Sequence, residues 1–236
     1  MEYDASRNWE KGLAVDILDN SFPAQGLIRL IKGNYPNLRK IGDRLRALDL
    51  GCGDGRNSKF LHDMGHETIG LEISQKIVGE LEKKYPMMQF IVGQNSEIPL
   101  PNDSVDLIVA WNSIYYMGPL GGDILENFRE CARVLKSGSN SRLIVSVPMP
   151  SSFIYRNSIT ISENFDVKYQ KITEDPYNLR VGETLAMFPD LNILKHALQI
   201  AGFSDFEVGE EMGDWFGRQY DWWVVSCSPL QQKLSD

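Results

Sequence analysis

The sequence predicts an α/β fold, a doubly wound sheet of seven mostly parallel strands with an antiparallel last strand. Short apolar runs alternate with amphipathic helical segments between residues 45 and 147, as expected for parallel strands joined by crossover helices. Several of these runs are apolar on both faces, which is typical of buried parallel strands. A glycine-rich turn closes the first run and indicates a tight connection from strand to helix.

The individual elements follow from hydrophobic spacing and from capping residues. Residues 22–34 carry apolar side chains at helical spacing after Pro23, which predicts a lead-in helix. Ser74 is suited to cap a helix that runs to residue 85. The other elements of the alternation are strands over 45–50, 67–73, 88–92, 105–111 and 143–147 and helices over 56–64 and 124–135.

The regular alternation stops after Pro148. Residues 149–189 show no clear strand–helix unit, so we expect an irregular lid or insertion over the active site. Asp190 can cap a helix that runs to residue 201. Two closing strands over 203–208 and 222–227 are joined by a turn-rich connection and should pair antiparallel. We expect a single domain over residues 1–236, with lead-in helices within residues 1–40.

Composition excludes several classes of function. A net charge of −8 opposes nucleic-acid binding, which depends on Lys and Arg neutralising phosphates, and no long basic run offsets it. The three cysteines lack metal-ligand spacing, so we expect buried thiols and no metal site. No apolar stretch approaches the roughly 20 residues of a membrane span, and residues 1–4 do not resemble a signal peptide. We therefore expect a cytoplasmic protein off the membrane, either a monomer or a homodimer.

A ligand site is predicted at the turn over residues 49–55, DLGCGDG. Its glycines allow a ligand to lie against bare backbone. Glu72 stands at the end of the second strand, where a carboxylate can accept hydrogen bonds from both ribose hydroxyls. The turn and the acid together favour a nucleotide-like ligand over a plain structural turn.

The glycine spacing indicates which nucleotide. The dinucleotide fingerprint is G-x-G-x-x-G, whereas position 56 is Arg here, which disfavours a nicotinamide oxidoreductase. Asp49 would repel a pyrophosphate but suits a ligand with an ammonium and a sulfonium group. We therefore expect S-adenosylmethionine (SAM) as cofactor and S-adenosylhomocysteine (SAH) as its product.

Further motifs accompany the turn and the acid. They are LEI at residues 71–73, GQNSEIPLP at 93–101, NDSVDLI at 102–108 and RECARVLKSG at 129–138. In these segments the chain resembles the class I SAM-dependent methyltransferases, specifically the methyltransferase-domain group related to ubiquinone and tellurite-resistance methyltransferases. The resemblance runs from about residue 45 to 147 and implies a Rossmann-like fold and methyl transfer.

The resemblance also implies roles for matching residues. Asp49 and the glycine turn would hold the methionine moiety, Glu72 the ribose, and Gln94 with Asn95 the adenine. Gln94 stands where the family usually has Asp, so its amide oxygen would have to accept the bond from the adenine amine. The expected cofactor-binding residues are Asp49, Gly51, Cys52, Gly53, Gly55, Asn57, Glu72, Ile73, Gln94, Asn95, Ser96, Trp111, Tyr3 and Trp9.

The acceptor site is expected near residues 111–116, which follow the fourth strand at the crevice edge of the sheet. Tyr115, Tyr116, Tyr155 and Arg156 are the candidate substrate-binding residues, and half-buried packing is the alternative for the two adjacent tyrosines. Methyl transfer mainly requires a nucleophile held against the methyl carbon. If a hydroxyl has to lose its proton, Tyr116 and His196 are candidate bases, although His196 also fits a solvent-facing helix position.

The sequence therefore predicts a methyltransferase that acts by in-line displacement on an O, N or C centre of a small molecule. Two alternatives stay open. One is a module that binds SAM or SAH without catalysis, because binding residues alone do not establish turnover. The other is a methyltransferase acting on protein or RNA, of which the acidic charge opposes only the RNA case.

Overall fold

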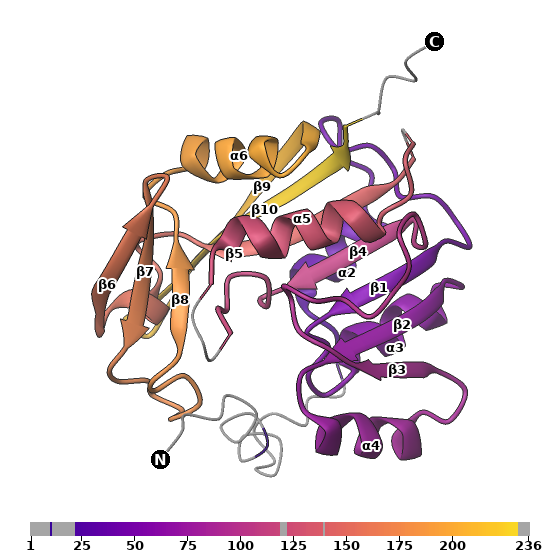
Figure 1. Ribbon diagram of the computed structural model, residues 1–236, viewed down its shortest axis with the longest axis horizontal. Coiled ribbons are helices and arrows are strands. Elements are labelled where there is room, and N and C mark those ends of the chain that lie inside the picture. The colour runs from indigo at the N-terminus through magenta and orange to yellow at the C-terminus, as the bar shows by residue number, and fades with distance from the viewer. Residues whose placement is uncertain (1–9, 11–21, 119–121, 139, 231–236) are drawn as a thin grey trace.

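The computed structural model describes residues 10, 22–118, 122–138 and 140–230 (Figure 1). In these residues no helix is long and apolar enough to span a membrane. Within the same ranges no group of His, Cys, Asp and Glu side chains could hold a metal ion.

A mixed seven-stranded sheet forms the centre of the molecule, in the order β3-β2-β1-β4-β5-β10-β9. Its strands are β1 (Arg46–Leu50), β2 (Glu67–Glu72), β3 (Gln89–Val92), β4 (Leu107–Trp111), β5 (Arg142–Pro148), β9 (Phe203–Trp215) and β10 (Arg218–Pro229). The pairs among β1 to β5 are all parallel, whereas β10 runs antiparallel to both β5 and β9. This confirms the predicted fold class.

Helices cover both faces of the sheet (Figure 1). They are α2 (Gln25–Lys32), α3 (Arg56–Asp63), α4 (Gln75–Lys84), α5 (Ile124–Val134) and α6 (Leu191–Ile200). Side chains alternate along each strand, so Ala47 packs with α2 and α3, whereas Leu48 packs in the larger core with α5 and α6. The predicted capping residues act as expected: Ser74 Oγ accepts from Ile77 N, and Asp190 Oδ1 accepts from Asn192 N.

The structure corrects the expectation that residues 149–189 are irregular. A short 3₁₀ turn (η1, Phe153–Tyr155) leads into an antiparallel sheet of β6 (Ser158–Asn164), β7 (Val167–Ile172) and β8 (Thr184–Met187). β6 does alternate at Ile159 and Ile161, but the apolar run is short and both side chains are more than half exposed, so it gives only a weak strand signal. Backbone bonds from Met117 N to Thr184 O and from Ala186 N to Tyr115 O tie this small sheet to the loop after β4.

The closing hairpin is also longer than predicted. β9 and β10 extend over 13 and 12 residues and are joined at Phe216 and Gly217, both at positive φ. The glycines and acidic residues between positions 209 and 214 therefore belong to an exposed ribbon and not to a turn-rich connection. The predicted antiparallel pairing of the two strands is confirmed.

Candidate functional site

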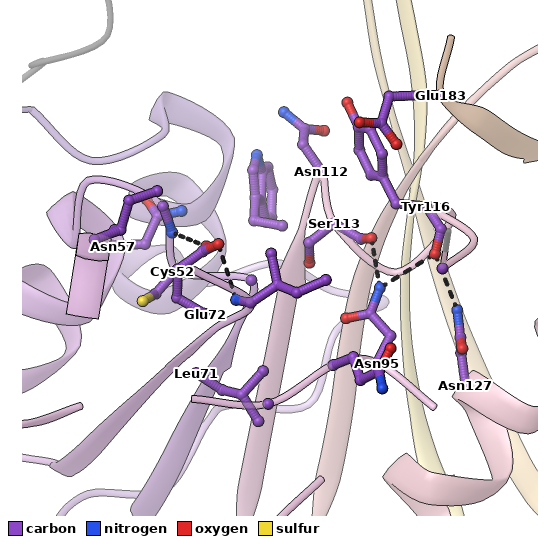
Figure 2. A pocket seen from close by; sticks show the side chains of 18 of the residues that line it. Cys52, Asn57, Leu71, Glu72, Asn95, Asn112, Ser113, Tyr116, Asn127 and Glu183 are labelled. Carbon is purple, nitrogen blue, oxygen red and sulfur yellow. Dashed lines mark hydrogen bonds between the residues drawn. The ribbon is translucent and has the colours of Figure 1, made fainter. Parts of the chain in front are cut away.

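A cleft with a cavity of about 250 Å³ opens where β1, β2 and β4 end (Figure 2). Its walls come from the turn after β1, the end of β2, the loops after β3 and β4, and the segment before β8. Of the expected cofactor-binding residues, those that line it are Gly51, Cys52, Gly53, Asn57, Glu72, Ile73, Gln94, Asn95, Ser96 and Trp111. Tyr3 and Trp9 lie outside the described residues.

The glycine turn presents bare backbone to the cleft at one position in particular. Gly53 has φ +55°, and no heavy atom lies within 4 Å of the place where a Cβ would stand. A ligand can therefore lie directly against this backbone. Gly55 has a different role: it does not line the cleft, and a Cβ there would come within 2.7 Å of Leu81 on α4. The structure therefore assigns Gly55 to packing against α4, and its contact with the cofactor stays a prediction.

Glu72 is a buried carboxylate held by three backbone amides. Its Oε2 accepts from Gly53 N at 3.1 Å, and its Oε1 accepts from Ile73 N at 2.9 Å and Ser74 N at 3.3 Å. Burial raises the pKa of Glu72, and these amide bonds partly offset the rise. Oε2 accepts one protein bond, so it keeps a lone pair for a ligand hydroxyl.

Asp49 lies beneath the glycine turn. It is buried, accepts a 2.6 Å hydrogen bond from Ser58 Oγ, and is not among the residues that line the cleft. Desolvation raises the pKa of Asp49 to about 7. The expected direct contact with a ligand is thus not seen, because the side chain points into the protein toward α3.

Two asparagine side chains fix the loop after β4 (Figure 2). Asn95 Nδ2 donates to Ser113 O at 2.9 Å, and Asn127 Nδ2 donates to Ile114 O at 2.9 Å. The sequence analysis missed Asn127, although a polar residue on the apolar face of a predicted helix was a signal for it. Asn95 therefore shapes the cleft wall through its amide nitrogen.

Tyr116 joins a buried charged cluster at the edge of the cleft. Arg180 Nε donates to the Tyr116 hydroxyl at 2.9 Å, and Arg180 Nη1 pairs with Asp175 Oδ1 at 3.0 Å. Glu183, also buried, lines the same wall. Burial raises the pKa of Tyr116, more than Arg180 lowers it, so the hydroxyl stays protonated at neutral pH. The arrangement does not favour Tyr116 as a general base.

A second cavity of about 390 Å³ adjoins the cleft, and the two share Trp111, Asn112 and Arg180 as lining residues. Aromatic side chains dominate its walls: Trp111, Tyr115, Phe153, Tyr177, Trp215, Tyr220 and Trp222. The candidate substrate residue Tyr115 therefore faces this cavity, whereas its neighbour Tyr116 faces the cleft.

Three further candidates lie elsewhere. The Tyr155 hydroxyl donates to Ala186 O at 2.8 Å inside the core, and Arg156 is exposed after η1. Neither lines the cleft or the second cavity. His196 is exposed on α6, which packs on α5 and β9, so it cannot reach the cleft as a base. The structure therefore brings none of these three residues to the lining of the cleft or of the second cavity.

Comparisons with known proteins agree with the motifs. Residues 48–141 match the family described as "Methyltransferase domain". A probable SAM-dependent methyltransferase of Mycolicibacterium smegmatis is 29% identical over 173 residues, which are 72% of this chain and 55% of that protein. A second such protein, from Mycobacterium tuberculosis, is 29% identical over 107 residues, or 45% of this chain and 37% of its own length. The chain thus spans about half or less of these relatives.

A solved structure shares the fold over most of the chain. The 1,6-didemethyltoxoflavin-N1-methyltransferase of Burkholderia thailandensis, with 1,6-didemethyltoxoflavin and SAH bound, aligns with a TM-score of 0.63. The alignment covers 95% of this chain and 85% of that one at 12% sequence identity. At this identity the likeness concerns the fold.

Proposed function

We propose that the chain is a class I SAM-dependent methyltransferase, as the match of residues 48–141 to the methyltransferase domain and the similar mycobacterial proteins indicate, and that it transfers a methyl group from SAM to a small-molecule acceptor. The observation that carries this proposal is the cleft at the carboxyl ends of the parallel strands, with Glu72 and the backbone of Gly53 on one wall. Ligands of open α/β sheets bind at this edge.

The residues of the cleft fit the cofactor. Gly53 offers an open stretch of backbone, and Glu72 keeps lone pairs for ribose hydroxyls beside it. Gln94, Asn95 and Ser96 form the neighbouring wall, where we place the adenine. We place the methionine end over the turn above Asp49, whose carboxylate would stabilise a positively charged ligand when ionised.

Bound there, SAM would supply a methyl group on a sulfonium for direct transfer to the acceptor, with the electron pair of the carbon–sulfur bond left on sulfur and a proton lost from the acceptor. The chain's own task is to position the acceptor and exclude water. We infer that residues 149–189 serve as a lid that excludes water from the cleft, because Leu179, Arg180 and Glu183 in this segment complete the cleft wall. We assign no base, since burial raises the pKa of Tyr116 more than Arg180 lowers it and His196 is exposed on α6.

A small-molecule acceptor is supported by the second cavity, whose size falls within the range of small-ligand pockets. It meets the cleft at Trp111 and Asn112, so an acceptor held there would lie against the cofactor's site. The Burkholderia methyltransferase with bound 1,6-didemethyltoxoflavin shares this overall fold. A protein acceptor and a non-catalytic SAM-binding role remain the competing functions.

The test begins with isothermal titration of the protein with SAM, SAH and NADH. We expect SAM and SAH to bind and NADH to give no heat of binding; binding of NADH alone would overturn the proposal. A panel of small-molecule acceptors is then incubated with SAM and the release of SAH is measured. SAM binding without SAH release from any small molecule, but with methylation of added protein, would favour the competing enzyme function.

A further inference from the structure

The second cavity has a continuous aromatic wall. The ring centroids of Phe153 and Tyr220 lie 4.6 Å apart, and those of Tyr220 and Trp222 lie 5.5 Å apart with their planes at 26°. Phe153 and Trp222 are 6.3 Å apart, so the three rings form one cluster. This cluster is built from η1 and β10, and all three residues line the cavity but not the SAM cleft.

A second aromatic surface bounds the cavity at the junction with the cleft. Trp111 lines both spaces, and a methyl group at Gly26 would come within 2.6 Å of its ring and 2.8 Å of Glu211 Oε2. The absence of a side chain at Gly26 therefore lets Trp111 and Glu211 converge at one wall. Glu211 places a hydrogen-bond acceptor beside the aromatic surface.

The charged side chains around the second cavity are of both signs and do not favour a strongly charged ligand. Arg29, Arg180 and Glu211 line it, so both signs are present. Arg180 already pairs with Asp175 and bonds to Tyr116, which leaves little of its charge for a ligand. Recognition by shape and by aromatic faces is therefore favoured over recognition by charge.

We propose that this cavity binds a planar aromatic or heteroaromatic acceptor that carries a hydroxyl or N–H group. This inference rests on the proposed function, whose acceptor it specifies. The ring stacks against the Phe153–Tyr220–Trp222 cluster, and its donor group faces Glu211 near Trp111. The volume of about 390 Å³ suits a compound of a few fused rings.

The test is calorimetric titration of the full chain with 2-naphthol and with decahydro-2-naphthol, its saturated and non-planar counterpart, each with and without saturating SAH. We expect 2-naphthol to bind at least tenfold more tightly than the saturated compound. Equal affinities, or binding of the saturated compound alone, would overturn the proposal. The titrations without SAH test binding in the second cavity even if the chain does not bind SAM or SAH. A failure of the proposed acceptor class can therefore be distinguished from a failure of the proposed methyltransferase function.

Variants locate the binding. Phe153→Leu keeps an apolar side chain but removes one aromatic face, and should weaken 2-naphthol binding about five- to tenfold while SAH affinity is unchanged. Phe165→Leu makes the same replacement at an exposed turn between β6 and β7 and should change neither affinity. Tyr220→Leu provides a second position if Phe153→Leu lowers the melting temperature strongly. Unchanged 2-naphthol affinity in the folded cavity variants would place the probe elsewhere and reject the assignment.

Discussion

Arg180 Nε donates to the hydroxyl of Tyr116 at 2.9 Å and thereby ties the segment before β8 to the loop after β4. The same guanidinium pairs with the buried carboxylate of Asp175 at 3.0 Å. The side chain of Asp175 is 2% exposed, and its other oxygen accepts from the backbone amides of Leu179 and Arg180. The pair therefore both closes the cleft wall and stabilises the small sheet next to it.

Replacing Arg180 should be strongly destabilising. Arg180→Gln leaves Asp175 buried without its counter-charge, and we expect a loss of about 3–5 kcal/mol in the free energy of unfolding, measured by urea denaturation. Adding Asp175→Asn removes the stranded charge and should recover part of that loss. Arg156→Gln, an exposed arginine of the same segment, should change stability by less than about 0.5 kcal/mol. A double variant no more stable than Arg180→Gln alone would show that the pair does not act as a unit.

Glu72→Gln should weaken SAM binding. The Glu72 carboxylate accepts from the backbone amides of Gly53, Ile73 and Ser74 with both of its oxygens. A glutamine amide is uncharged and has only one acceptor oxygen, so it cannot keep all of these bonds and also accept from a ligand hydroxyl. Hydrogen bonds to a charged group contribute about 1.5–3 kcal/mol, so we expect a roughly 10- to 150-fold loss of SAM affinity by calorimetry. The control is Glu67→Gln at the other, exposed end of β2, which should bind SAM as the unchanged chain does. Equal SAM affinity of the two variants would show that Glu72 does not bind the cofactor.

The central sheet and one wall of the cleft were predictable because their signals are local. Residues 45–147 alternate strand and helix with clear hydrophobic spacing, and the glycine turn and Glu72 stand directly at strand ends. Parallel strands bring such ends to one edge whatever the rest of the chain does. For that reason the sequence alone predicts that Gly53 and Glu72 lie together.

The opposite wall was not predictable in the same way. Arg180 and Tyr116 are 64 positions apart, and nothing in the spacing of residues 149–189 shows that β8 returns to the loop after β4. The backbone bonds that fix this return, such as Ala186 N to Tyr115 O, carry no side-chain signature. The chemistry of Tyr155 and Arg156 suits a substrate site, but the fold buries Tyr155 in the core and exposes Arg156 to solvent.

Asp49 should make the stability of the chain depend on pH. Its pKa is raised by burial to about 7, above its ordinary value, so the folded chain binds more protons than the unfolded chain between about pH 4 and 7. Stability should therefore fall as pH rises through this window and level off above it. In Asp49→Asn this contribution is absent, so the difference in unfolding free energy between the two chains should change between pH 4 and 7. A constant difference across that range would contradict the raised pKa.

Ser58→Ala provides the complementary change. The Ser58 hydroxyl donates to Asp49 Oδ2 and lowers its pKa against the effect of burial. Without this bond the pKa of Asp49 should rise further, and the pH-dependent loss of stability should extend above pH 7. If the window does not move in denaturation curves recorded from pH 5 to 9, Ser58 does not control this carboxylate.

Gly53→Ala should separate backbone strain from loss of the ligand site. Gly53 and Gly65 both have positive φ, and neither has a heavy atom within 4 Å of the place a Cβ would occupy, so alanine at either position adds strain of about 1–2 kcal/mol without a clash. Only Gly53 lines the cleft, where the added methyl group would stand between a ligand and the backbone. Both variants should lose similar stability in urea, whereas Gly53→Ala alone should lose tenfold or more in SAM affinity by calorimetry. If Gly65→Ala lost as much affinity, the effect would come from general destabilisation, and the assignment of bare backbone at Gly53 to the cofactor would fail.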